Sequence, residues 1–310
     1  MRSRSSKLRN LVATYWQPAV FYGMLIIFFG LLLWFQLGKL PGGFSAEEQA
    51  ALQASSGLRH IFDNPLNAPF TIIAYLFGLA HIGDQHLLPM RAAATALGLL
   101  TLTTFYWLVR HWHGERSAIL GTIAFGCSAW FLHTARLGTP DVLMFMLIGL
   151  VACSVWIKHT DTPLVLLAGF GLVAGLLYIP GMIWLLLAAA IWQAKSLTRL
   201  FKEHFTLMSL GSLGLLVLIT PLVWAIYKSA ETAKLLAGLP ADGWPQILDV
   251  LTRLASIPYN LLIRGPLDPE NWLGRLPILD AFCTAMLVLG AYLYARHIKL
   301  SRSKMVAVVL

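Results

Sequence analysis

Long runs without a charged residue constrain the fold of this chain more than any other feature of its sequence. The first run extends from Leu11 to Gly38, and later runs reach the roughly 17–25 residues that an α-helix needs to cross a bilayer. Charged residues make up 12% of the chain, about half of the value typical of a soluble domain. The sequence therefore predicts an all-α polytopic membrane protein with one transmembrane domain over residues 1–310.

Clusters of Lys and Arg predict which helix ends face the cytoplasm, because basic residues gather on that side of membrane proteins. Such clusters precede the first run, form "RHWHGER" at 110–116, and recur around 158, 195–202 and 296–304. Placing them all inside predicts a plasma (inner) membrane protein with a cytoplasmic N-terminus. It gives about eight spans, at 19–37, 87–109, 117–135, 142–157, two within 162–194 that are separated at "YIPG", 206–227 and 277–295. The net charge of +9 then reflects these clusters, and we expect no binding to nucleic acid.

Two regions are expected on the outer side of the membrane, at 38–86 and 228–276. The first contains "APFTIIAYLFGLAHIG" (68–83), which is apolar but short. If this segment crossed the membrane, the basic cluster at 110–116 would lie outside, so the threading predicts a short interfacial or membrane-embedded helix instead.

Two adjacent carboxylates, Glu47 and Glu48, follow the first apolar run. Ser45 and Glu48 have the S-x-x-E spacing of a capping box, and Glu47 suits the dipole of a first helical turn. Capping alone explains the pattern. The same helix start would also hold a carboxylate rigidly at the membrane surface, which is what a catalytic base requires.

A second acidic position lies in "ARLGTPDVL", where Arg136 and Asp141 flank the boundary between two predicted spans. Pro140 is suited to the first position of a helix, and Asp141 to its first turn. Arg91 lies just inside the outer end of its predicted span, where a charge is costly unless it reaches the interface or is paired. These residues are either ordinary membrane-edge residues or ligands of an anionic group.

Other site chemistry has no pattern to support it. The histidines do not show a metal-binding spacing, the three cysteines lie in apolar runs, and the glycines within spans do not form a phosphate-binding loop. We therefore predict no cofactor and no metal site, and a divalent metal is an alternative that no residue pattern supports.

The order of several segments resembles the GT-C membrane glycosyltransferases of the protein-O-mannosyltransferase and aminoarabinose-transferase type. These segments are "GGFSAEEQAAL", "NAPFTIIAYLFGLAHIG" and the stretch from "RAAATALGLLTL" to "HTARLGTPDVLM". The resemblance puts Glu47 at the family's catalytic aspartate, Arg91 at the family arginine and Asp141 at the second acidic position. Asn67 falls where some members carry a lysine or arginine near the donor phosphate.

The resemblance implies a GT-C-like bundle with short helices in its outer first loop. It also implies an inverting reaction, in which a sugar moves from a polyprenyl-phosphate donor to a lipid, glycan or protein hydroxyl at the extracytoplasmic face. Glu47 would act as the general base, with Glu48 or Asp141 orienting the reactants. Arg91, Arg136 and Asn67 would lie near the donor phosphate. The C-terminal "MVAVVL" resembles the start of a further span, which would make this chain a truncated or shortened member.

Two other functional classes stay open at this point. A transporter, lipid flippase or scaffold would also be polytopic, although charged residues deep in the spans would be expected of a transporter. A degenerate family member that binds lipid-linked sugar without transferring it is the other alternative, because Glu47 stands where the family has aspartate.

Overall fold

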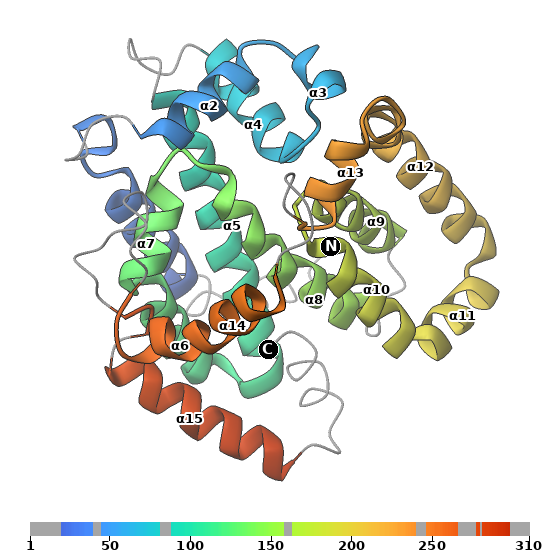
Figure 1. Cartoon of the computed structure of the whole chain (residues 1–310). Coiled ribbons are helices and arrows are strands. Elements are labelled where there is room, and N and C mark those ends of the chain that lie inside the picture. The colour runs from blue at the N-terminus through green and yellow to red at the C-terminus, as the bar shows by residue number, and fades with distance from the viewer. Residues whose placement is uncertain are drawn as a thin grey trace, which may run out of the picture.

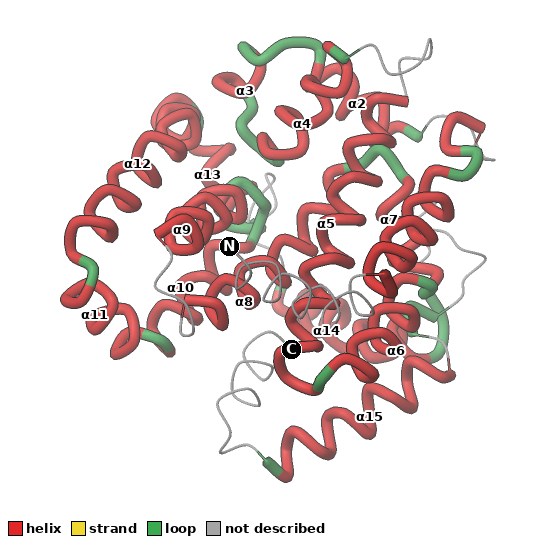
Figure 2. Tube along the Cα trace, turned by 180° about the vertical axis from the view of Figure 1, so that it is seen from behind, coloured by secondary structure: helices red, strands yellow, loops and turns green. Residues whose placement is uncertain are grey.

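The computed structural model describes residues 20–39, 45–80, 88–157, 163–239, 246–265, 277–279 and 281–297. All regular structure in these segments is helical (Figure 2), without a strand. This confirms the all-α prediction for the described part of the chain. The N-terminal basic cluster and the C-terminal "MVAVVL" lie outside the described residues.

Four helical segments of the described chain are long and apolar enough to cross a membrane. Their length and composition support a polytopic membrane protein, as predicted. They are Val20–Lys39, which ends in the 3-10 helix η1 (Leu37–Lys39); α5 (Leu88–His113); Pro140–Ile157, made of the 3-10 helix η2 (Pro140–Phe145) and α8 (Met146–Ile157); and α12 (Phe205–Lys228).

The predicted number of about eight spans is not confirmed, because the remaining apolar segments form shorter or broken helices. The segment predicted as one span at 117–135 forms α6 (Glu115–Gly126) and α7 (Ala129–Arg136), which meet at an angle of 66°. Ser128 explains the break, because its hydroxyl accepts the Phe131 N–H at the start of α7 and donates to the Phe125 carbonyl of α6. A side-chain cap of this kind starts a new helix rather than continuing the old one.

The predicted division at "YIPG" is confirmed. α9 (Pro163–Leu177) and α10 (Met182–Trp192) are separated by a tight turn at these residues. Gly181 has a φ of 77° in this turn, a conformation that glycine adopts without steric cost. Both helices are shorter than a full span, as is α15 (Ala281–Arg296).

Helix α5 is the centre of the bundle and packs against α4 (Ala68–Leu79), α6, α7 and α8. Small side chains allow this close packing, as they do generally between membrane helices. Ala92, Ala93 and Ala94 are fully buried, and Gly98 lies directly against Ala135 of α7. The N-terminal end of α5 is thereby surrounded by neighbouring elements on several sides.

The helices of the first loop lie together at one end of the bundle, at the top of Figure 1. They are α2 (Ala46–Ser55), α3 (His60–Asp63) and α4 (Ala68–Leu79). Helix α4 packs against both α2 and α5, and its Phe70 belongs to a buried cluster with Met90 and Val142. The short helix that was predicted at 68–83 is therefore present, and it connects the first loop to the start of α5.

The opposite end of the bundle carries the turn between α5 and α6 and the helix α11 (Ala194–Glu203), as Figure 1 shows. This end holds two of the basic clusters, with Arg110 and Arg116 at the turn and Lys195, Arg199 and Lys202 on α11. The first loop and these clusters thus lie at opposite ends of the molecule.

The second predicted outer region contains α13 (Ala230–Leu236) and α14 (Ile247–Leu262). Helix α13 follows α12 and contacts the α9–α10 turn, where the Gly181 N–H donates to the Leu236 carbonyl at 2.9 Å. Helix α14 has no buried residue. The last described helix, α15, reaches the end of α5, where Tyr294 and His113 are joined by a hydrogen bond of 2.8 Å.

Candidate functional site

The start of helix α2 has the predicted capping box. The Ser45 hydroxyl accepts the Glu48 N–H at 3.0 Å, and the Glu48 carboxylate accepts the Ser45 N–H at 3.4 Å. The two N–H groups that a capping box pairs are thereby satisfied. The box orients Glu48 toward the interior of the bundle, where it is fully buried.

Glu48 forms a buried ion pair with Arg91, a contact that the sequence spacing did not predict. The Arg91 guanidinium donates in parallel, from Nε to Oε1 at 2.8 Å and from Nη2 to Oε2 at 2.9 Å. Its Nη1 donates to the Leu37 carbonyl at 3.1 Å. Arg91 is only 2% exposed, and a charge buried this deeply is tolerated only with a well-aligned partner. The pair therefore ties together the end of the first span, α2 and α5.

Gly138 completes the surroundings of the Glu48 carboxylate. Its backbone N–H donates to Oε1 of Glu48 at 2.8 Å. A Cβ at this position would lie 3.1 Å from that oxygen, 3.1 Å from Cβ of Met90 and 3.4 Å from Cγ of Arg91. Glycine is therefore the residue that allows the backbone after α7 to approach the ion pair. Sequence reasoning missed Gly138, although it lies between Arg136 and Asp141 in the segment that was singled out.

The electrostatic environment keeps Glu48 ionised. Burial alone would raise the pKa of this carboxyl, but hydrogen bonds from Arg91, Gly138 and Ser45 and the charge of Arg91 outweigh the effect of burial. The pKa of Glu48 therefore lies below its ordinary value. A carboxylate of low pKa whose oxygens already accept several hydrogen bonds is a poor proton acceptor, so Glu48 is suited to positioning rather than to general-base chemistry.

Glu47 lies beside Glu48 in the first turn of α2, but it is exposed. The two neighbouring carboxylates thus have different environments, because successive residues of a helix point about 100° apart. The buried contacts of Glu48 fix the first turn of α2. Glu47 lies on this turn, at the surface of the first loop.

The segment from Arg136 to Asp141 brings further polar groups next to the ion pair, through Gly138. Nη2 of Arg136 donates to the Phe35 carbonyl, while its buried Nε has no hydrogen-bond acceptor among the described residues. The fully buried hydroxyl of Thr139 also lacks a partner within the described part of the chain. Asp141 is exposed in the first turn of η2, after Pro140 as predicted, although this turn is a 3-10 helix.

Asn67 lies at the start of α4, as its N-cap residue. It is half-buried with a φ of 57°, and its backbone N–H donates to the Tyr178 carbonyl at 2.9 Å. This bond attaches the start of α4 to the α9–α10 turn. Of the six predicted site residues, the structure joins Glu48 to Arg91 directly and brings the chain segment that carries Arg136 and Asp141 against them.

Within the described residues, no three His, Cys, Asp or Glu side chains are grouped so as to hold a metal ion. Comparisons of the chain with models of protein families, with curated proteins and with solved structures find no match.

Proposed function

We propose that this protein is a membrane glycosyltransferase of the GT-C type, which transfers a sugar from a polyprenyl-phosphate donor to an acceptor hydroxyl. The observation that carries the proposal is the division of labour between two adjacent carboxylates. Glu48 is locked by Arg91 and Gly138, and Glu47 is exposed on the same helical turn. A base that must accept a proton at one point in space benefits from such a rigid support.

The reaction needs a base on the acceptor side of the transferred sugar and an anion-stabilising group on its phosphate side. In the proposed reaction the acceptor oxygen attacks the anomeric carbon as Glu47 takes its proton. The bond from that carbon to the phosphate oxygen breaks with inversion, and the polyprenyl phosphate leaves with the electron pair. Asp141, which is also exposed, orients the acceptor or the sugar.

The leaving phosphate needs cationic or hydrogen-bonding donors that are already in position. Arg136 and Thr139 are the best candidates, because the buried Nε of Arg136 and the Thr139 hydroxyl have no acceptor among the described residues. Arg91 contributes indirectly, since its guanidinium is engaged by Glu48 and by the Leu37 carbonyl. We assign Arg91 to positioning in place of a direct phosphate contact.

The proposed orientation puts this end of the bundle on the extracytoplasmic face of the plasma (inner) membrane. The basic residues of α11 and of the α5–α6 turn lie at the other end, which supports a cytoplasmic location for that end. The acceptor class, whether lipid, glycan or protein, and the identity of the sugar are left open by the proposal.

The test is sugar transfer by the purified chain in proteoliposomes that contain a radiolabelled polyprenyl-phosphate sugar and a panel of acceptors. We expect Glu47→Gln to lower the turnover rate by at least about a hundredfold, the usual contribution of a general base. The matched control is Glu231→Gln. Glu231 is likewise an exposed glutamate two positions after a capping serine, Ser229, on α13.

Undiminished turnover in Glu47→Gln would contradict the assignment of Glu47 as the base. A second outcome would contradict the enzymatic function itself. If the wild-type chain bound the labelled donor but transferred the sugar to none of the acceptors, the protein would be one that only binds lipid-linked sugar.

A further inference from the structure

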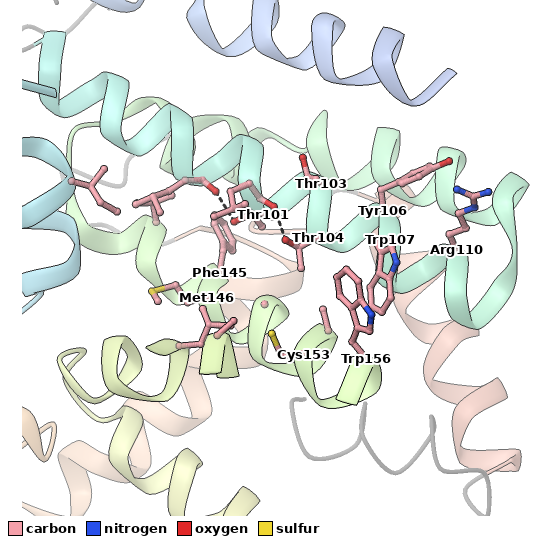
Figure 3. A pocket seen from close by; sticks show the side chains of 18 of the residues that line it. Thr101, Thr103, Thr104, Tyr106, Trp107, Arg110, Phe145, Met146, Cys153 and Trp156 are labelled. Atoms are coloured by element: carbon pink, nitrogen blue, oxygen red, sulfur yellow. Dashed lines mark hydrogen bonds between the residues drawn. The ribbon is translucent and has the colours of Figure 1, made fainter. Parts of the chain in front are cut away.

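A deep apolar groove runs between α5 and α8, away from the Glu48–Arg91 pair. Its volume is about 760 Å³, and Figure 3 shows side chains of both helices turned toward it. The hydroxyls of the groove-lining threonines of α5 are satisfied by carbonyls of the same helix, so they need no partner from a ligand. Thr101 donates to the Leu97 carbonyl at 2.8 Å, and Thr104 donates to the Leu100 carbonyl at 2.7 Å. The groove is therefore suited to a hydrocarbon chain.

One end of the groove is polar and incompletely satisfied. Tyr106 is 3% exposed, and its buried hydroxyl has no hydrogen-bond partner in the described part of the chain. Arg110 lies one helical turn further on; its side chain is 41% exposed, and its guanidinium is 3.6 Å from the Glu115 carboxylate. Figure 3 shows the Tyr106 hydroxyl and the Arg110 guanidinium at the same end. A buried hydroxyl without a partner is costly, so this end is suited to a ligand that supplies an acceptor.

The length of the groove indicates how a ligand would lie. From Leu97 to Arg110, α5 rises about 20 Å, against roughly 30 Å for the hydrocarbon core of a bilayer. Arg110 is near the end of α5, at the level of the basic turn that leads to α6. A chain in the groove would therefore extend from the membrane interior to a head group at the membrane surface.

We propose that the groove binds one acyl chain of an anionic phospholipid, whose phosphate lies against Arg110 and accepts a hydrogen bond from Tyr106. The stacked rings of Trp107 and Trp156, with centroids 4.8 Å apart, form the wall next to this head group. Arg110 and Arg91 lie near opposite ends of α5, so this lipid is distinct from the proposed sugar donor. The inference does not depend on the transferase activity.

The test is native mass spectrometry of the full chain after delipidation, with titration of phosphatidylglycerol and phosphatidylcholine that carry the same acyl chains. We expect one tightly bound lipid and a preference of about tenfold for the anionic head, the size of one charge-assisted contact. Arg110→Gln should abolish this preference, and Tyr106→Phe should weaken the binding of both lipids. Arg116→Gln is the matched control, because Arg116 is an exposed arginine of the same turn that does not line the groove.

A second variant tests the position of the chain. Cys153 lines the groove, so Cys153→Phe should exclude both lipids while the helical circular dichroism and the elution volume stay unchanged. An unchanged head-group preference in Arg110→Gln would overturn the proposal. The proposal would also be overturned if a polyprenyl phosphate displaced the phospholipid and bound equally well to Arg110→Gln, since the groove would then hold the tail of the donor.

Discussion

Two neighbouring glutamates differ in burial because adjacent residues of a helix point in different directions. Glu48 points into the bundle and meets Arg91, while Glu47 points outward. Truncating one partner of a buried ion pair leaves the other charge without compensation. The pair is thus the point in the candidate site that is most sensitive to substitution.

We expect Glu48→Gln to lower the free energy of unfolding by about 3–5 kcal/mol, because the Arg91 guanidinium would stay buried without a counter-charge. Unfolding by denaturant in mixed micelles, followed by circular dichroism, would measure this loss. The control is the adjacent exposed Glu47→Gln, for which a change of less than about 0.5 kcal/mol is expected. Equal effects of the two substitutions would contradict the assigned burial.

The same pair predicts a dependence of stability on pH. The pKa of Glu48 is lowered in the folded chain, so its contribution is present above the unfolded carboxyl pKa of about 4.3 and is lost as the pH falls toward the lower folded value. The thermal midpoint of the wild-type chain should therefore fall more steeply below about pH 4.3 than that of Glu48→Gln. Parallel curves for the two proteins would refute this linkage.

At the scale of elements, the close contact between α5 and α7 depends on small residues. A Cβ on Gly98 would lie 2.7 Å from Cβ of Ala135, and Thr95 also donates to the Ala135 carbonyl at 3.2 Å. This contact holds the end of α7, and with it the segment around Gly138, against α5. The approach of the two helices is therefore a condition for the geometry around Glu48.

Gly98→Ala should destabilise the fold by about 1–3 kcal/mol through overpacking, although alanine is the better helix former. Gly214→Ala provides the matched control on α12, since a Cβ there meets nothing within 4 Å, and it should be neutral or slightly stabilising. Thermal unfolding in detergent would separate the two variants. A neutral Gly98→Ala would show that α5 and α7 are less closely packed than the structure indicates.

The positions of the long apolar helices were largely predictable from the sequence. The breaks between helices were predictable only in part. The turn at "YIPG" was predicted because proline and glycine disrupt a helix wherever they occur in this combination. The break between α6 and α7 was not, because Cys127 and Ser128 are compatible with a continuous apolar helix. There the Ser128 cap and the packing of α7 on α5 decide the direction of the chain.

For the whole molecule, the first loop and the basic clusters of α11 and the α5–α6 turn lie at opposite ends. Single cysteines in a background without Cys127, Cys153 and Cys283 can test the proposed orientation. A cysteine at the exposed Gln49 of α2 should react with an impermeant maleimide added to intact cells. A cysteine at the exposed Ser117 of α6 should react only after permeabilisation, and labelling of both from the same side would refute the threading.

The sequence by itself determined that the described chain is helical, and roughly where its long apolar helices begin and end. Uncharged runs, capping serines and proline–glycine turns are local signals, so they can be interpreted without knowledge of the fold. Only the tertiary structure decided that Glu48 is the buried carboxylate, that Arg91 is its partner and that Gly138 closes the site. Those residues lie 43 and 90 positions from Glu48, and the S-x-x-E pattern is the same whether its glutamate faces solvent or a buried guanidinium. The burial of a charge depends on what packs around it, and here α2, α5 and the segment around Gly138 must come together before the ion pair has its full set of hydrogen bonds.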